Sequence, residues 1–514
     1  MSHTRVLITG AGPTGLVLAI WLKRLGVPFR IIDRTAEPGT TSRALVVHAR
    51  TLELYRQVGL AEAVVERALR FTAANLWAGG RKAGRVVFGP MGEGLSPFPY
   101  MLIFPQDQHE RLLTERLAHA GVRVERRTEL LGFKDGGGSV LARLRLPDGT
   151  EEECEADYIA GCDGAHSTVR EGLAIGFPGG TYSHLFYVAD AEAAGPVMNG
   201  ELHVALDDAD FLAVFPLAGA GRARLIGTVR REAQGQDDTL TWDDVGKDVI
   251  ERLGISVERV SWFSTYRVHH RVAERFRRGR AFLLGDAAHI HSPVGGQGMN
   301  TGIGDAVNLA WKLAAVLQGR AEPALLDTYE PERIAFARRL VATTDRAFTV
   351  VTSPGRVARW LRVDVAPKLL PVLFRWNAFR RLMFRTVSQI AITYRGSSLS
   401  EGRAGRVAGG DRLPWIPADN FRPLGSLDWQ VHVYGVAGAG IRETCGRRGL
   451  ALHTFPWQSA AARAGLARDA VYLVRPDGHV GLADRGGTPA TLEGYLDRLG
   501  LRPRAAEQSP TTVH

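Results

Sequence analysis

Residues 5–15 of the chain read RVLITGAGPTG, and this stretch decides how the fold begins. The apolar residues of Arg5–Thr9 predict a short buried strand, and Leu16–Leu25 predicts a helix directly after the glycines. A second strand, Phe29–Ile32, is expected to end at the acidic residue Asp33. A strand, a glycine turn, a helix and a second strand in this order predict the start of a nucleotide-binding α/β domain.

Each part of this turn has a physical reason. The first glycine permits the tight turn, the second lets a pyrophosphate touch the backbone, and the third lets the helix pack closely on the strand. The acid at the end of the second strand is at the spacing expected of a residue that holds a ribose diol. A glycine turn with no binding role is the disfavoured alternative, because the strands, the helix and the acid all accompany it. The predicted binding residues are Gly10, Gly12, Pro13, Thr14, Gly15, Asp33 and Arg34.

A second glycine-rich stretch lies far along the chain, in residues 280–313. Residues 281–284 predict a short buried strand, after which Asp286 places a carboxylate at the strand's C-terminal end, where ligands of open α/β sheets bind. Four of the nine residues after Pro293 are glycines, and the pattern becomes helical from about Thr301. A bare backbone loop beside a helix N-terminus favours an anionic or flat ligand. A glycine turn in an ordinary α/β domain is the alternative.

A third turn of the same kind follows the expected strand Ala156–Ala160. Cys162, Asp163 and Gly164 form the turn, and hydroxyl residues after it are expected to cap a helix. A helix cap with no further role is again the alternative.

Residues 176–267 predict an antiparallel sheet with one helix, at Asp243–Leu253, inserted between Arg170 and Arg280. A nucleotide-binding fold interrupted by a second sheet creates a crevice in which ligands commonly bind. We expect four parts: a cofactor domain in residues 1–175, of which 72–104 joins the second sheet; a substrate domain in 176–270; the rest of the cofactor domain with a helical segment in 271–400; and a small α/β domain in 401–514.

Three further stretches complete the chain. Arg356–Thr386 is basic and apolar, so it suits either a membrane surface or packing against the protein, and we favour packing. Gly402–Gly410 is rich in glycine and arginine and is expected to be a linker. Arg475–Gly478 is expected to be a plain hairpin turn, and the tail after Pro503 is expected to be disordered.

The composition limits the partners. The chain has 514 residues and a formal net charge of +10, but its basic residues are interspersed with acids and form no RNA-reading motif, so nucleic acid is not expected. The three cysteines form no C-x-x-C pair or metal-ligand cluster. We see no signal peptide and no membrane-spanning run. A cytoplasmic monomer or homodimer with small-molecule partners and no metal is expected.

Together, the three glycine turns resemble those of the FAD-dependent aromatic hydroxylases, the class A flavoprotein monooxygenases, over roughly residues 4–345. The long form with a terminal hairpin of the type Val-Leu-Val-Arg-Pro-Asp-Gly is similar to the polyketide-hydroxylase branch, whose last domain is thioredoxin-like. The resemblance implies a multidomain α/β (α+β) fold: a Rossmann-like FAD domain, an inserted antiparallel substrate sheet, a helical segment and a thioredoxin-like domain. No dithiol chemistry is implied, because the last domain lacks a C-x-x-C.

The resemblance also assigns roles, residue by residue. The positions implied for FAD, beyond the seven given above, are Arg43, Gln106, Asp163, Asp286, Pro293, Gly296, Gly298, Met299 and Asn300. Pro293, Gly296 and Asn300 are implied to lie at the reacting ring and count as catalytic positions. Asp33 replaces the family's usual glutamate, and Ser292 replaces a frequent proline. His289 is tempting as a base, but its place in a turn favours a scaffold role.

The implied reaction is hydroxylation of a phenolic, polycyclic aromatic substrate. NADPH or NADH would reduce the flavin, and molecular oxygen would add to it to give a C4a-hydroperoxide whose distal oxygen attacks an electron-rich ring carbon. Candidate substrate residues on the inserted sheet are Phe211, Phe215, Tyr266 and Arg271. Two alternatives are a reductase or Baeyer–Villiger enzyme on the same scaffold and a non-catalytic FAD-binding partner of another protein.

Overall fold

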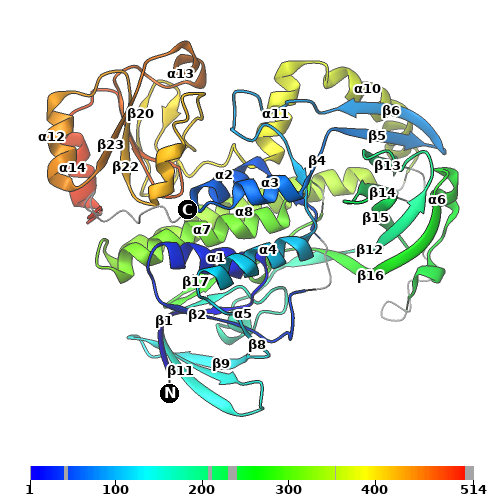
Figure 1. The fold of residues 1–514 in the computed structure, drawn as a ribbon, viewed down its shortest axis with the longest axis horizontal. Coiled ribbons are helices and arrows are strands. Elements are labelled where there is room, and N and C mark those ends of the chain that lie inside the picture. Colours follow the sequence, from blue (N-terminus) through cyan, green and yellow to red (C-terminus); the bar gives the residue numbers. More distant parts are fainter. Residues whose placement is uncertain are drawn as a thin grey trace.

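The computed structural model describes residues 2–39, 44–206, 211–229, 240–293, 295–352 and 355–503. Figure 1 shows a parallel sheet with helices above it at the bottom of the molecule, a second sheet at the right and a small terminal domain at the upper left. The long helices α7 (Gly298–Leu317) and α8 (Tyr329–Thr352) run through the centre between these parts. The expected multidomain α/β fold is thereby confirmed.

The first sheet holds the N-terminal strand at its centre, and five of its strands run parallel in the order β18-β11-β1-β2-β8. Val6, Leu7 and Ile8 on the central strand are fully buried, as is usual for a parallel sheet covered on both faces. The strands are β1 (Ser2–Thr9), β2 (Phe29–Asp33), β8 (Glu125–Arg126), β9 (Glu129–Asp135), β10 (Val140–Arg145), β11 (Glu151–Gly161), β17 (Arg277–Arg278) and β18 (Ala281–Leu283).

Helices α1, α4 and α7 lie together above this sheet (Figure 1). Leu16, Trp21, Ile303 and Trp311 are among their buried side chains, so apolar burial holds these helices in place. The helices of this part are α1 (Pro13–Arg24), α2 (Ala49–Gln57), α3 (Ala61–Arg67), α4 (Gln106–His119) and α5 (Thr168–Gly172). Ser167 caps the last of these by accepting a hydrogen bond from the Arg170 amide at 3.0 Å, as the hydroxyl pattern predicts.

The second sheet is built around two long paired strands, β12 and β16, and is antiparallel except for the pair β13 and β5. Its edge strand β19 (His289–Ile290) comes directly after the end of the first sheet, so the two sheets meet there. Its other strands are β5 (Ala73–Ala78), β6 (Arg81–Val87), β12 (Gly179–Ala194), β13 (Leu202–Leu206), β14 (Phe211–Pro216), β15 (Arg222–Thr228) and β16 (Ser256–Val272).

Two details differ from the sequence analysis in this part. The helix expected at Asp243–Leu253 is shorter, because a 3-10 turn at Trp242–Asp244 precedes α6 (Asp248–Arg252). A small third sheet, which the sequence did not indicate, lies between the two large ones and consists of β3 (Val46–Val47), β4 (Leu69–Arg70) and β7 (Leu102–Ile103).

Four strands of the terminal domain lie in the order β25-β24-β22-β23. β24 pairs antiparallel with both β25 and β22, and β22 pairs in parallel with β23, which is the thioredoxin-like arrangement. Cys445 is a buried free cysteine, so this domain carries no disulfide. Its elements are β20 (Glu401–Ala404), β21 (Val407–Ala408), β22 (Gln430–Tyr434), α12 (Ala439–Arg448), β23 (Ala451–Phe455), α13 (Ser459–Ala464), β24 (Val471–Val474), β25 (Val480–Asp484) and α14 (Pro489–Arg498).

The linker expected at Gly402–Gly410 is wrong. The stretch forms β20 and β21, and β20 pairs in parallel with β25 as part of the terminal sheet. A Cβ atom on Gly409 would lie 2.1 Å from the Glu401 amide nitrogen, so this glycine allows close backbone packing rather than flexibility. The tail after Pro503 lies outside the described residues.

The packing expected for Arg356–Thr386 is confirmed in part, because Phe384 is fully buried and Phe374 packs against the main core, whereas other apolar side chains of the stretch stay exposed. The stretch forms α9 (Arg356–Trp360), a π-helical turn, α10 (Ala366–Leu373) and α11 (Asn377–Val387). Trp360 and Trp376 are 56% and 62% exposed. None of the helices that the structure describes is long and apolar enough to cross a membrane.

The hairpin turn at Arg475–Gly478 is not plain, because its side chains form a buried ionic cluster with α7 and α8. Arg475 binds the carboxylate of Glu332 at 2.7 Å and that of Asp477 at 2.7 Å, and Lys312 binds Glu332 at 2.8 Å. The side chains of Arg475, Glu332 and Lys312 are all 0% exposed. Burial alone would raise the pKa of Glu332, but the two cations hold it well below its usual range.

Removing Arg475 should therefore destabilise the whole protein. We expect Arg475→Met to lower the free energy of unfolding by about 3–5 kcal/mol, because it leaves the Glu332 carboxylate buried with one cation fewer. The matched control is Arg447→Met, which breaks an exposed pair with Glu493 and should cost less than about 1 kcal/mol. Urea unfolding of both variants measures the difference, and equal stabilities would contradict the role of the cluster.

Candidate functional site: a nucleotide cleft at the strand ends

The three glycine turns that the sequence analysis singled out meet at one edge of the parallel sheet. β1, β11 and β18 are neighbours in that sheet, and their C-terminal ends lead into Gly10, Cys162 and Gly285. A Cβ atom on Gly10 would lie 2.3 Å from the Cys162 carbonyl oxygen, and the residue has φ +98°. Only glycine fits this position, because both the space and the backbone conformation exclude a side chain.

Two helix N-termini close in on the same edge. α1 begins at Pro13, and α7 begins at Gly298, three residues before the expected start at Thr301. The Thr14 side chain of α1 contacts α7 and the third turn, because added Cβ atoms on Gly302 and Gly285 would lie 2.3 and 2.7 Å from its hydroxyl oxygen. The positive ends of two helix dipoles therefore face one region, which favours a negatively charged ligand.

A cavity of about 360 Å³ opens at this edge. Five of the predicted cofactor positions line it, namely Gly10, Gly12, Asp33, Arg34 and Asp163. A Cβ atom on Gly12 would meet nothing within 4 Å, so open space lies directly above this glycine at the N-cap of α1.

Asp163 offers an unused acceptor to this cavity. Its Oδ2 accepts a hydrogen bond from the Val169 amide at 3.2 Å, but its Oδ1 is buried and has no hydrogen-bond partner among the described residues. Burial raises the pKa of this carboxyl. A buried acceptor without a partner is costly, so the site is built for a ligand that donates a hydrogen bond here.

Asp33 also lines the cavity. Its carboxylate accepts hydrogen bonds from the Ala11 amide at 2.7 Å and from the Thr35 amide at 2.8 Å, and Arg126 lies 3.7 Å away. The side chain thereby ties the glycine turn to the end of β2 and keeps a negative charge at the rim.

Gln106 is the first residue of α4 and belongs to a hydrogen-bonded group at the rim. Its Oε1 accepts from the Ala44 amide at 3.3 Å, and its Nε2 donates to Glu110 at 2.8 Å. Glu110 also accepts from the Gly39 amide at 3.0 Å. These bonds hold the two described ends of the segment that contains Arg43, which itself lies outside the described residues.

Asp286 occupies an exposed position in the 3-10 turn Gly285–Ala287, which follows β18. Beneath it, Asp305 accepts hydrogen bonds from the Gly285 amide at 3.0 Å and from Arg333 at 2.6 Å, and it lies 2.7 Å from His289 Nε2. His289 is buried in this group, in agreement with a scaffold role.

The loop from Pro293 is held by Asn300 in the first turn of α7. Its amide nitrogen donates to the carbonyls of Val46 at 2.8 Å and Gly296 at 2.9 Å. Its amide oxygen accepts from the His48 amide at 2.9 Å and the Thr51 hydroxyl at 2.7 Å. All its hydrogen bonds therefore go to protein, and they fix the loop beside the third, small sheet.

Other predicted residues of the same loop lie close to Asn300. Gly296 needs its missing side chain, because a Cβ atom would lie 2.8 Å from Val46. Met299 packs partly buried against the main core, and Gly298 starts the helix. His48 Nε2 lies 2.9 Å from the Gly295 carbonyl oxygen, and burial lowers the pKa of this histidine to about 4.

The four candidate substrate residues do not form one cluster. Phe211 and Tyr266 both pack with Phe186, whose ring stacks on Tyr266 at 5.9 Å. Phe215 packs in a separate group with Leu45 and Ile103 beside the small sheet.

Arg271 lies at the end of β16, where it pairs with the edge strand that leads to the loop. Its guanidinium donates to the Phe177 carbonyl at 3.4 Å.

The residues present fit a flavin dinucleotide. Open space above Gly12 at a helix N-terminus suits a pyrophosphate, and the unpartnered Asp163 oxygen suits a hydroxyl or N–H donor of the cofactor. No cluster of three or more metal-ligating side chains occurs in the part of the chain that the structure describes. Fold and cleft together define a dinucleotide-binding protein with an inserted second sheet.

The comparisons with known proteins agree. The chain belongs to the FAD binding domain family, whose sequence model matches residues 3–344. It is 38% identical over 415 residues to the 6-methylpretetramide 4-monooxygenase of Streptomyces rimosus. The aligned region covers 79% of this chain and 72% of that protein. The resemblance to flavin-dependent aromatic monooxygenases of the polyketide-hydroxylase type is thereby confirmed.

Two solved structures extend the likeness to the terminal domain. The OxyS anhydrotetracycline hydroxylase from Streptomyces rimosus is 29% identical with a TM-score of 0.78, covering 97% of this chain and 100% of that one. The rebeccamycin biosynthetic enzyme RebC with reduced flavin is 28% identical with a TM-score of 0.80, covering 97% and 99%.

Sequence reasoning missed several residues that line the cleft, among them Glu110, Arg126 and His166. Glu110 had a detectable signal, because it lies one helical turn after Gln106 and so shares its face of α4. Arg126 had none, because its place depends on the pairing of β8 with β2.

Two glycines of the first turn provide a matched test of the cleft. Gly12→Ala should fold normally but bind FAD at least tenfold more weakly, because its new methyl group meets no protein atom and enters the space for the pyrophosphate. Gly15→Ala should destabilise the fold itself, because its Cβ would lie 2.0 Å from the Gly10 carbonyl oxygen. Thermal unfolding and FAD titration of both variants separate the two effects, and unchanged FAD affinity of Gly12→Ala would rule out this placement.

Proposed function

We propose that this protein is an FAD- and NAD(P)H-dependent monooxygenase that hydroxylates a phenolic, polycyclic aromatic substrate. The observation that supports the proposal is a cleft lined by the first two glycine turns and by the unpartnered Asp163 carboxylate oxygen, at the sheet edge where the third turn also begins. Membership in a family of flavin-dependent monooxygenases supports the reaction type. A cytoplasmic location and the domain limits given above remain predictions.

In this proposal the residues of the first turn bind the cofactor. The amides after Gly12 at the start of α1 hold the pyrophosphate, and Asp33, which lines the cavity, holds the adenosine ribose. Arg34 and Arg43 contribute positive charge near the phosphates, and Gln106, Asp163 and Asp286 accept or donate hydrogen bonds along the ribityl chain.

The loop that starts at Pro293 would lie beside the flavin ring at which the reaction takes place. When bound, reduced FAD supplies the activation of molecular oxygen. The N-terminus of α7, with Gly298 and Met299 in its first turn, stabilises negative charge on the ring without a cationic side chain. Asn300 and Gly296 keep the loop in the shape that excludes water from the ring.

The substrate would bind between this loop and the second sheet. By their names, two of the relatives act on 6-methylpretetramide and on anhydrotetracycline. In this chain, the aromatic group around Phe186, Phe211 and Tyr266 offers flat apolar surface for such a substrate. Phe215 lies closer to the small sheet, and Arg271 would attract a phenolate.

Asp286 tests the cofactor assignment. We expect Asp286→Ala to purify with partial FAD occupancy, because each charge-assisted hydrogen bond to a cofactor hydroxyl contributes roughly 1.5–3 kcal/mol. The flavin absorbance per protein measures occupancy. Release of FMN in place of FAD from the denatured wild-type protein, or full occupancy of the variant at low free FAD, would oppose the assignment.

The oxygen atom that reaches the product tests the reaction. With isotope-labelled oxygen gas, one labelled atom should appear on the aromatic ring of a polycyclic phenol, and NAD(P)H should be consumed faster with that substrate than without it. Mass spectrometry of the product measures both incorporation and the kind of product. Label from water, a ring-expanded ester or a reduced product would point instead to another reaction, including the Baeyer–Villiger and reductase alternatives.

A further inference from the structure

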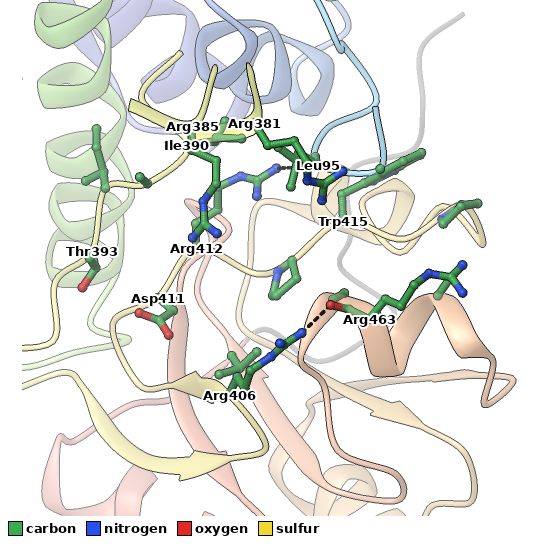
Figure 2. Close-up of a pocket in the computed structure, with 18 of the residues that line it drawn as sticks. Leu95, Arg381, Arg385, Ile390, Thr393, Arg406, Asp411, Arg412, Trp415 and Arg463 are labelled. Carbon is green, nitrogen blue, oxygen red and sulfur yellow. Dashed lines mark hydrogen bonds between the residues drawn. The ribbon is translucent and has the colours of Figure 1, made fainter. Parts of the chain in front are cut away.

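We propose that a second cavity, between α11 and the terminal domain, binds a small organic diphosphate such as a nucleotide. The cavity has a volume of about 750 Å³ and shares no lining residue with the FAD cleft. Figure 2 shows Arg381, Arg385 and Arg412 on one side of it and Arg406 and Arg463 on the other. The inference goes beyond the proposed function and holds whether or not the protein hydroxylates a phenol.

The charge of the lining is strongly unbalanced. Among the described residues that line the cavity, six are arginines and one, Asp411, is acidic. Asp411 is already paired with Arg395 at 2.7 Å, and Arg412 is paired with the buried carboxylate of Glu53. These two arginines are therefore neutralised within the protein.

The other four arginines form no ion pair with a carboxylate of the described residues. Arg381 donates to the Glu93 carbonyl at 2.8 Å, and Arg463 donates to the Ser459 hydroxyl at 3.0 Å. Arg406 donates to the backbone carbonyl of Arg463, so its guanidinium lies against α13. Uncompensated like charges repel one another, so four of them around one hollow favour a multiply charged anion.

These cations come from two separate parts of the chain. Arg381 and Arg385 lie on α11, whereas Arg406 lies in the turn between β20 and β21 and Arg463 lies on α13. An anion between them would bind both parts through planar guanidinium groups, which suit the paired oxygens of phosphate.

The remaining walls indicate that the ligand has an organic part. Trp415 lines the cavity, and its indole Nε1 is buried without a hydrogen-bond partner among the described residues. Ile390, Ile392 and Pro414 add apolar surface. The volume lies within the roughly 300–1,000 Å³ of small-molecule pockets and exceeds what an inorganic diphosphate needs.

Two kinds of ligand combine a diphosphate with an organic part. One is the nicotinamide dinucleotide that the proposed function already requires, and the other is a nucleotide unrelated to the reaction, which would act from a distance. A test with pyrophosphate, ADP and NADP⁺ in parallel distinguishes them, because only the first source predicts that NADP⁺ binds more tightly than ADP.

The experiment is calorimetric titration of the FAD-loaded protein with inorganic pyrophosphate at low salt. The filled FAD cleft leaves the arginine cavity as the site to be measured. We expect saturable binding of one pyrophosphate per chain, displaced by ADP or NADP⁺. The double variant Arg385→Gln/Arg463→Gln should bind at least roughly tenfold more weakly, because it removes two charge-assisted contacts.

The matched control is Arg123→Gln/Arg485→Gln, which removes two exposed arginines outside the cavity. It should change the affinity by less than about twofold. Equal weakening in both double variants would show a general effect of net charge and overturn the site, as would the absence of saturable binding. FAD content and product formation are measured separately, so failure of this inference and failure of the proposed function remain distinguishable.

Discussion

The ion pair between Arg475 and Glu332 is the interaction on which the arrangement of the molecule depends. Both side chains are fully buried, so neither charge is tolerable without the other. Lys312 on α7 shares the carboxylate, which means that one cluster joins α7, α8 and the terminal hairpin. The first turn of α7 holds Asn300, so the cluster and the Pro293 loop are joined to the same helix.

The parts of the site that could be predicted from the sequence are those whose geometry is local. Gly10 needs a positive φ and has no room for a side chain, and Gly285 has the same two constraints, so only glycine satisfies them. Strand and helix patterns on either side then identify the turn. The second sheet was predictable for a similar reason, because its strands alternate with clear turns.

The features that could not be predicted depend on contacts between distant residues. Nothing in the sequence around Arg475 indicates that Glu332, 143 positions away, is its partner. The local sequence therefore predicts only an ordinary hairpin turn. Gly402–Gly410 has the composition of a linker, and only the approach of the Glu401 backbone to Gly409 shows why small residues are needed there. The free oxygen of Asp163 is likewise visible only after the strands are placed.

The hydrogen bonds of Asn300 have a consequence for the evolution of such chains. They join the cofactor loop to the start of α2, where Arg50 donates to the carbonyl of Asp477 and Glu53 pairs with Arg412. One short helix thus touches both the Pro293 loop, which we propose to lie at the flavin ring, and the terminal domain. The terminal domain is therefore not an interchangeable module, and recombination that replaced it would have to supply matching partners for α2 to leave the cofactor loop intact.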